Sequence, residues 1–211
     1  IDYTFDINKE LYLYSDKIYK KINNILFNQD NTPGEFIYWT LKEIEEQKSS
    51  SLRAISMGGR IKNDAIKLGG LDSKQKELKE IDNIIILGCG TSYNAGHFVY
   101  HYFKKYSIFN TVQVIDGADF NKDDIPKYGI SGCFFLSQSG ETLDLIRCLD
   151  ICKKLDIITI GIVNVVDSTI ARETDCGCYI NAGREVGVAS TKSFTSQVIV
   201  LLLINNWFNS N

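Results

Sequence analysis

Five short apolar runs, separated by segments with helical periodicity, constrain the fold of this chain more than any other feature. Strands that are apolar along their whole length are typical of a parallel sheet covered by helices on both faces. We therefore predict an α/β fold, a three-layer sandwich around a five-stranded parallel sheet of the flavodoxin-like type, with strand order 2-1-3-4-5. The predicted strands are Ile84–Leu87, Thr111–Ile115, Gly132–Leu136, Ile157–Val163 and Cys176–Ile180.

Helical patterns fill the intervals between these runs and most of the chain before them. Lys9–Phe27 has apolar residues at helical spacing, which predicts an amphipathic helix or a partly ordered arm. Thr32–Glu35 combines a capping threonine, a proline at the first helical position and a glutamate at the third. We expect residues 1–31 to be an N-terminal arm or helix and residues 32–211 to form the α/β domain. The predicted helices are 32–47, 49–57, 73–80, 93–106, 141–155, a short turn at 168–172, and 190–208.

The loop after the third strand is rich in hydrogen-bond donors. It joins a strand to a helix, and a helix start leaves N–H groups unpaired and carries partial positive charge. Its hydroxyls and amide add further donors, and Gly140 lets the backbone approach a ligand closely, so the loop suits a phosphate group. The alternative is an ordinary N-cap of serine and threonine. The loop is Ser137-Gln138-Ser139-Gly140-Glu141-Thr142.

The loop after the first strand contributes Thr91 and Ser92 to the same edge of the sheet. In the predicted strand order, the ligand crevice lies where strands 1 and 3 diverge, at their carboxyl ends. The Gly-x-Gly pattern at Gly88 raises a dinucleotide-binding alternative, with Asp116 as the ribose-binding acid. The third glycine of that motif would fall at Tyr93, which disfavours it, so we expect Asp116 to be a turn or cap residue.

A third loop, residues 182–192, leads into the last helix. Two glycines, Gly183 and Gly187, precede Ser190 and Thr191, which stand at the predicted N-cap. These groups offer more donors to the same crevice. The alternative is a long capping loop without a ligand.

Composition and charge exclude several classes of function. The chain has 211 residues, is 44% hydrophobic and carries a net charge of -3, which is typical of a globular domain. No basic field indicates nucleic-acid binding, and no basic amphipathic helix indicates a membrane surface. The apolar run Val198–Ile204 is too short to span a bilayer. We expect no signal peptide, and because the sequence begins with Ile1 we expect it to be a piece of a longer protein.

Cysteines and histidines do not form a recognisable metal or disulfide pattern. The six cysteines contain no C-x-x-C pair, which indicates core residues in a reducing, cytoplasmic compartment. His97 and His101 stand one helical turn apart, but no third ligand is visible, so we predict no metal. Cys89 is either an activated thiol or a small residue in a tight turn, and no histidine is placed to activate it.

Four motifs in order resemble the glutamine–fructose-6-phosphate aminotransferase family, also called glucosamine-6-phosphate synthase. The resemblance covers about residues 32–211 and corresponds to the first of the two sugar isomerase (SIS) domains of that family. The motifs are residues 89–93, 134–142, 172–176 and 187–192 with 195–197, and the segments Lys42-Glu43-Ile44, Glu46-Gln47 and 68–71 fit the same family.

The resemblance implies a site for a sugar phosphate. Fructose 6-phosphate, glucosamine 6-phosphate and glucose 6-phosphate are the ligands that it implies, and it implies no cofactor and no metal. The phosphate would be held by Ser137, Gln138, Ser139 and Thr142, and the sugar by Thr91, Ser92, Val188 and Ser190.

The same resemblance implies that this chain is one part of a larger catalytic unit. The family makes glucosamine 6-phosphate from fructose 6-phosphate and glutamine, for hexosamine biosynthesis, and it is dimeric through its isomerase domains. Its base glutamate, ring-opening histidine and Schiff-base lysine belong to the second SIS domain and the C-terminal tail. We therefore expect no catalytic residue here, an inactive fragment, a homodimer, and a glutaminase domain and second SIS domain in the parent chain. Asn94, Arg184 and Ser193-Phe194 depart from the usual family residues, and the alternative function is a non-catalytic module that senses a phosphosugar.

Overall fold

The computed structural model describes residues 2–5, 11–15, 18–21, 32–63 and 65–209, which fall into two compact units, Ile1–Trp39 and Thr40–Asn211. The first unit contains an antiparallel sheet of order β1-β2-β3. Its strands are β1 (Asp2–Phe5), β2 (Leu11–Ser15) and β3 (Ile18–Lys21).

The helix predicted over Lys9–Phe27 is wrong for the described residues of this range, which form β2 and β3. The other residues of the range lie outside the described residues. The run Leu11-Tyr12-Leu13-Tyr14 is rich in aromatic residues, which favour strands. A short apolar run of this kind fits both the helical and the strand periodicity, and here residues 11–15 form a strand.

The first helix, α1 (Trp39–Glu45), begins seven residues later than the capping signal at Thr32 predicts. Gly34 has a φ of 71°, a left-handed conformation that a right-handed helix excludes. A second helix, α2 (Gln47–Ala54), follows and leads into the 3₁₀ turn η2 (Ser56–Gly58). The prediction of two helices before residue 58 is therefore confirmed, with a different start for the first.

The five predicted strands of the second unit are confirmed as one fully parallel sheet of order β10-β9-β8-β6-β7. In order along the chain this is 2-1-3-4-5, the predicted order. The strands are β6 (Asn83–Gly88), β7 (Thr111–Asp116), β8 (Ser131–Ser137), β9 (Ile158–Val163) and β10 (Cys176–Tyr179).

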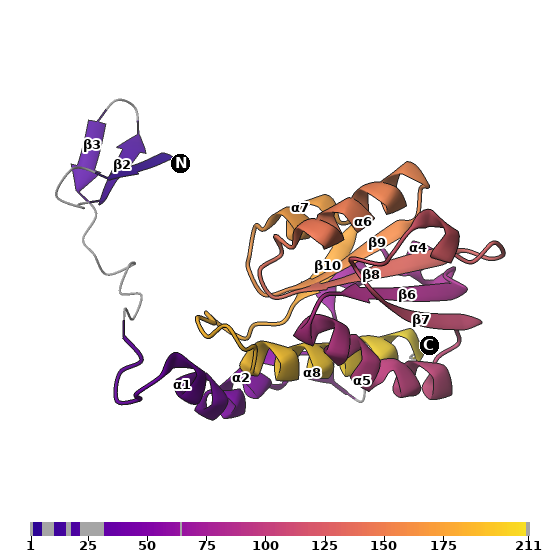
Figure 1. The fold of residues 1–211 in the computed structure, drawn as a ribbon, viewed down its shortest axis with the longest axis horizontal. Helices are drawn as coiled ribbons and strands as arrows, with labels where there is room; N and C mark the ends of the chain where they lie inside the picture. The colour runs from indigo at the N-terminus through magenta and orange to yellow at the C-terminus, as the bar shows by residue number, and fades with distance from the viewer. Residues whose placement is uncertain (1, 6–10, 16–17, 22–31, 64, 210–211) are drawn as a thin grey trace. The chain divides into compact units, whose positions relative to one another are not determined.

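Helices cover both faces of this sheet (Figure 1). The helices α5 (Thr91–Tyr106) and α8 (Lys192–Asn209) lie on one face. The other face is covered by α6 (Leu143–Lys154) and α7 (Thr169–Glu173). The predicted three-layer α/β sandwich is therefore confirmed.

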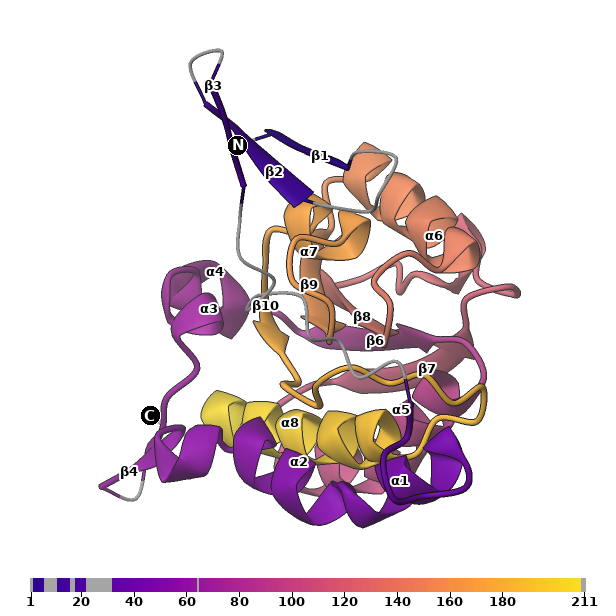
Figure 2. The same ribbon diagram turned by 90° about the vertical axis from the view of Figure 1, so that its left-hand side faces the viewer.

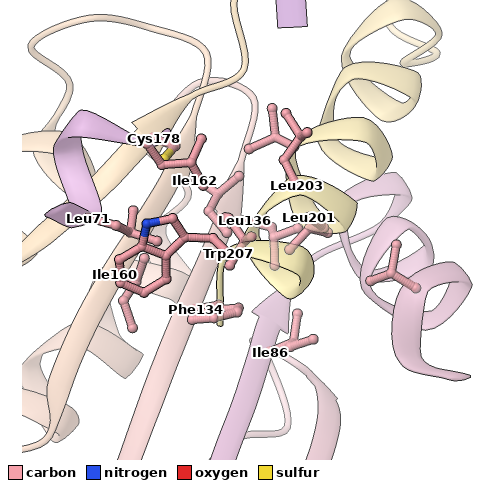
Figure 3. Packing of buried hydrophobic residues seen from close by; sticks show 14 of the residues in the cluster. Leu71, Ile86, Phe134, Leu136, Ile160, Ile162, Cys178, Leu201, Leu203 and Trp207 are labelled. Atoms are coloured by element: carbon pink, nitrogen blue, oxygen red, sulfur yellow. The ribbon is translucent and has the colours of Figure 1, made fainter. Parts of the chain in front are cut away.

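Alternate residues of each strand point to opposite faces, so the sheet separates two apolar cores. On β8, Phe134 and Leu136 join the core under α5 and α8, whereas Cys133 and Phe135 join the core under α6 and α7. Figure 3 shows the first core, in which Trp207 of α8 lies beside strand residues of the sheet.

Short elements that precede β6 in the chain contact the C-terminal half of α8. They are the hairpin β4 (Ile61–Lys62) and β5 (Ala65–Ile66), and the helices α3 (Gly69–Asp72) and α4 (Gln75–Lys79). The indole Nε1 of Trp207 donates to Asp72 Oδ1 at 2.8 Å. Lys79 Nζ donates to the carbonyl oxygens of Trp207 and Phe208 at 3.3 and 2.7 Å, which satisfies acceptors that a helix end leaves open.

The apolar residues of α8 pack into the core of the second unit. α8 packs along α2 and α5 (Figure 2), and Val200, Leu201 and Ile204 are fully buried. Most of the apolar surface of α8 is therefore covered inside this unit. In the described part of the chain, no helix combines the length and the apolar character needed to cross a membrane.

Candidate functional site

Three loops meet at the carboxyl end of the sheet, as the strand order requires. β6 and β8 are neighbours, and Gly88 at the end of β6 pairs with Leu136 of β8. The loop after β8 and the loop before α8 are joined through Asn164. Its backbone N–H donates to Gln138 O at 3.3 Å, and its side chain bonds Gly183 O at 2.7 Å and Ala182 N at 2.9 Å.

The loop 137–142, named here the phosphate loop, is held in shape by its own hydroxyls. Ser137 Oγ and Thr142 Oγ1 share a hydrogen bond of 2.9 Å, and Ser137 Oγ also accepts from Gly140 N at 2.9 Å. Ser139 Oγ accepts from Glu141 N at 3.1 Å. Ser137 is buried, whereas Gln138, Ser139 and Thr142 are half-buried, so these donors remain close to solvent at the sheet edge.

Thr142 is the N-cap residue of α6, but it does not cap the helix with its side chain. Among the described residues its hydroxyl makes no cap hydrogen bond to α6 and instead bonds Ser137. The N–H groups of the first turn of α6 therefore keep the partial positive charge that favours an anion. This geometry differs from the ordinary serine and threonine cap that the sequence left as an alternative.

Two contacts anchor the phosphate loop to α7. Glu141 Oε1 accepts from Thr169 N at 2.7 Å, and Gly140 O accepts from Ile170 N at 3.0 Å. Hydrogen bonds from Thr169 hold the pKa of the exposed Glu141 carboxyl below its ordinary value. The charge of Glu141 is thus directed to the start of α7.

Gly140 is required by its surroundings. Its φ is 68°, and an added Cβ would lie 1.9 Å from Ser168 Oγ. A side chain at this position would be strained by its backbone conformation and would also collide with a buried serine.

The loop after β6 turns directly into α5. Gly90 has a φ of 56° and is the N-cap residue, so Thr91 and Ser92 are the first two residues of the helix. Ser92 Oγ accepts a hydrogen bond of 2.9 Å from Nε2 of Gln197 on α8. Thr91 is exposed. The two predicted sugar-binding hydroxyls therefore stand beside each other at the sheet edge.

The start of α5 packs closely against the end of β6. An added Cβ at Gly88 would lie 2.7 Å from Tyr93 N, so this position has no room for a side chain. Asp116 Oδ1 accepts from Ala118 N at 3.0 Å, which confirms the predicted turn role of Asp116.

The loop before α8 is held by two carboxylates. Glu185 accepts from Thr191 N at 3.0 Å, from Ser193 N at 3.2 Å and from the Ser190 hydroxyl at 3.2 Å. Glu185 therefore caps α8, a role that the sequence assigned to Ser190 and Thr191. The second carboxylate, Glu43 of α1, accepts from Val186 N at 2.5 Å and from Gly187 N at 3.1 Å.

Val188 and Ser190 differ in their surroundings. The Val188 side chain is fully exposed, and the Ser190 side chain is half-buried against Glu185. Sequence reasoning did not find Glu43, Asn164, Glu185 or Gln197 as residues that shape the site. The segment containing Glu43 was noticed only for its resemblance to the family, which gave no contact.

The other chemically reactive side chains do not form a site. His97 and His101 are exposed on α5, where His97 contacts the ring of Tyr93 at a centroid distance of 5.2 Å. Within the described residues, no three His, Cys, Asp or Glu side chains gather as metal ligands. Burial raises the pKa of the Cys89 thiol, which disfavours the thiolate needed for nucleophilic attack.

All six cysteines lie in the described part of the chain and are free thiols. Burial raises the pKa of Cys148 and Cys178 to about 12. These thiols therefore stay protonated at neutral pH and behave as small core residues, as the sequence predicts.

Comparisons with known proteins relate this architecture to a family. Residues 77–205 match the family model described as SIS domain. The chain is 40% identical over 202 residues to a probable glutamine--fructose-6-phosphate aminotransferase [isomerizing] of Acanthamoeba polyphaga mimivirus, covering 96% of this chain and 33% of the relative. It is 42% identical over 172 residues to glutamine--fructose-6-phosphate aminotransferase [isomerizing] 1 of Rattus norvegicus, covering 81% of this chain and 25% of the relative.

A solved structure gives the same relationship. The C-terminal domain of glucosamine-fructose-6-phosphate aminotransferase from Francisella tularensis superposes with a TM-score of 0.75 at 33% identity, covering 82% of this chain and 48% of that one. A tagatose-6-phosphate ketose/aldose isomerase from Escherichia coli, at 16% identity and a TM-score of 0.65, shares the fold. The chain thus spans about a quarter to a third of the length of these curated relatives.

Proposed function

The chain belongs to the SIS-domain family, and from this premise we propose that it is the sugar-phosphate-binding part of the isomerase region of a glutamine–fructose-6-phosphate aminotransferase. Such an enzyme makes glucosamine 6-phosphate from fructose 6-phosphate and glutamine, in hexosamine biosynthesis. The sequence identity of 40–42% to aminotransferases of this name supports the proposal.

The observation that carries the proposal is the uncapped start of α6. Two hydroxyls of the phosphate loop bond each other beside the start of α6, and Thr142 does not cap the first N–H groups of that helix with its side chain. No lysine or arginine lies within Ser137–Thr142, so binding depends on hydrogen bonds and on the helix start rather than on formal charge. In this proposal Ser137, Gln138, Ser139 and Thr142 hold the phosphate.

The sugar lies next to the phosphate, toward the other two loops. Thr91 and Ser92 at the start of α5 and Val188 and Ser190 before α8 would contact it, because these residues flank the same edge. A sheet edge with hydroxyl groups on several loops suits a polyhydroxylated ligand, since each sugar hydroxyl can both donate and accept. Residues 32–211 would form this domain.

The remaining parts of the reaction belong to other parts of the parent protein. We propose a glutaminase domain and a second SIS domain as partners, a homodimer, and a cytoplasmic location that suits six free cysteines. Large exposed apolar side chains on α5 support self-association, because such surfaces often mark interfaces. They are Phe98, Tyr102 and Tyr106.

Two measurements test the proposal. Calorimetric titration of the chain with fructose 6-phosphate should give saturable binding, and inorganic phosphate should compete with it, because the phosphate loop recognises the anion. Absence of binding, or binding that phosphate does not reduce, contradicts the proposed site.

The second measurement concerns catalysis. Purified chain mixed with fructose 6-phosphate and ammonia should form no glucosamine 6-phosphate, because the groups proposed to transfer protons lie elsewhere in the parent. Formation of that product shows that the chain itself carries catalytic groups.

A further inference from the structure

Glu43 on α1 is a buried carboxylate whose partners lie 143 and 144 residues away along the chain. Its exposed fraction is 1%. Burying a carboxylate is costly unless it is hydrogen-bonded. Backbone N–H groups supply those bonds, with Glu43 Oε1 accepting from Val186 N at 2.5 Å and Oε2 accepting from Gly187 N at 3.1 Å.

Gly187 has no side chain, and this lets its backbone lie close to the Glu43 carboxylate. A Cβ added at Gly187 would lie 2.6 Å from Glu43 Oε2 and 3.0 Å from Thr40 Oγ1. The backbone must come this close for both of its N–H groups to reach one carboxylate. The absence of a side chain at residue 187 and the charge at residue 43 therefore serve one contact.

Two residues that follow α1 directly hold the start of α8. Glu46 forms an ion pair with Lys192, whose side chain is 3% exposed. Gln47 Oε1 accepts from Thr195 Oγ1 at 2.5 Å. Glu46 and Gln47 stand at the junction between α1 and α2, three and four residues after Glu43.

The segment between these anchors carries the proposed sugar contacts. It is fixed at Val186 and Gly187 by Glu43 and at Lys192 by Glu46. Between them, Val188 faces solvent. A loop fixed on both sides presents its middle residues in one conformation, which is how a scaffold orients a ligand-binding group.

We propose that Glu43 is a positioning residue for sugar recognition. Its carboxylate fixes the backbone of Val186 and Gly187 and thereby presents Val188 and Ser190 to the sugar, while the ligand does not touch Glu43. This inference rests on the proposed function, in which the phosphate loop binds the anion. It predicts that affinity for the sugar phosphate depends on Glu43 and that affinity for phosphate alone does not.

The test compares two ligands in matched variants of the full chain. Glu43→Ala should weaken fructose 6-phosphate binding on the order of tenfold, equal to about 1.4 kcal/mol. Inorganic phosphate, titrated separately by NMR at millimolar concentrations, should bind within about twofold of wild type. Glu43→Gln should give an intermediate loss, because its carbonyl oxygen can accept from Val186 but its NH₂ group opposes Gly187 N–H. Glu45→Ala removes an exposed carboxylate from the same helix and should change neither affinity.

Hydrogen exchange of backbone amides supplies a readout that needs no ligand. In Glu43→Ala the amides of Val186 and Gly187 should exchange faster, whereas the Gly140 amide of the phosphate loop should not change. Gly187→Ala should reproduce this pattern, because it displaces the carboxylate from its position. If circular dichroism shows that Glu43→Ala does not fold, the two ligand affinities and the amide exchange are measured with Glu43→Gln and Gly187→Ala instead.

Several outcomes overturn the inference. Unchanged fructose 6-phosphate binding in Glu43→Ala does so, and so does an equal loss for both ligands, which would indicate general loosening of the domain. If the amides of Val186 and Gly187 exchange at the wild-type rate in Glu43→Ala, Glu43 does not hold this segment, which also contradicts the inference. If wild type binds neither ligand, the proposed function fails, whereas the exchange data still decide whether Glu43 holds the loop.

Discussion

Nε2 of Gln197 donates a 2.9 Å hydrogen bond to Oγ of Ser92, and this bond joins α8 to the start of α5. Gln197 is buried, so its side chain is fixed by packing as well as by this bond. Ser92 can then present its remaining lone pair and its proton in a defined direction. Gln197, a residue of the last helix, thus orients the hydroxyl of Ser92 at the start of α5.

Replacing Gln197 tests the importance of this orientation. Gln197→Leu keeps a similar volume and removes the donor, so the folded state should lose about 1 kcal/mol, the usual net value of one hydrogen bond. Binding of fructose 6-phosphate should weaken severalfold, because the Ser92 hydroxyl becomes free to rotate. Urea denaturation and calorimetry measure the two effects, and Gln75→Leu on the exposed face of α4 is the control. Full affinity in Gln197→Leu would show that the orientation of Ser92 is not needed.

Thr142 provides the most direct test of the phosphate loop. A hydrogen bond to a charged group is worth about 1.5–3 kcal/mol, so Thr142→Ala should weaken binding of glucose 6-phosphate or fructose 6-phosphate by about tenfold or more. Thr142→Ser keeps the hydroxyl that bonds Ser137 and should bind nearly as wild type does. The fold should change little, because Thr142 does not cap α6 with its side chain within the described structure. Equal calorimetric affinities of wild type and Thr142→Ala would place the phosphate elsewhere.

Gly140 tests whether the shape of this loop matters as well as its donors. Gly140→Ala forces a left-handed φ on alanine and a collision with Ser168, and such strain costs about 1–3 kcal/mol. We expect a lower midpoint of urea denaturation and weaker competition by inorganic phosphate. Gly69→Ala is a matched control, because an added Cβ there would meet open space among the described atoms and alanine favours the helix. If Gly140→Ala is as stable and binds as well as Gly69→Ala, the loop tolerates another conformation.

The strands and their order were predictable because the central strands β6 and β8 contain uninterrupted apolar runs. Ile84–Leu87 and Gly132–Leu136 lie within β6 and β8, and no polar residue interrupts either run. From the order of parallel strands, the carboxyl ends that form the site follow directly. The place of the loop 137–142 at this edge was predictable too, because it follows β8 directly, whereas its role in phosphate binding stays a prediction.

Contacts between distant segments were not predictable. The carboxylate of Glu43 meets Val186 from 143 residues away, and no local pattern encodes that meeting. Local signals also failed at Leu11–Ser15, where the apolar pattern fits both a helix and a strand. They failed again after Thr32, because the left-handed conformation of Gly34 prevents a helix from starting at the capping signal. The helices that cover α8, α2 and α5, likewise follow from tertiary packing and not from the apolar sequence of α8 itself.

The pH dependence of stability should reveal the contact between Glu141 and α7. Hydrogen bonds from Thr169 lower the pKa of Glu141 in the folded state. A carboxyl whose pKa is lowered by folding adds stability above its unfolded pKa and loses it as pH falls through its folded value. Wild type should therefore be more stable than Glu141→Gln at neutral pH. The difference should shrink once pH drops below the ordinary glutamate pKa of about 4.3 and disappear below the folded value. Urea denaturation of both proteins across this range measures the effect, with Glu45→Gln on α1 as the control. A difference that does not depend on pH would mean that the charge of Glu141 does not stabilise the start of α7.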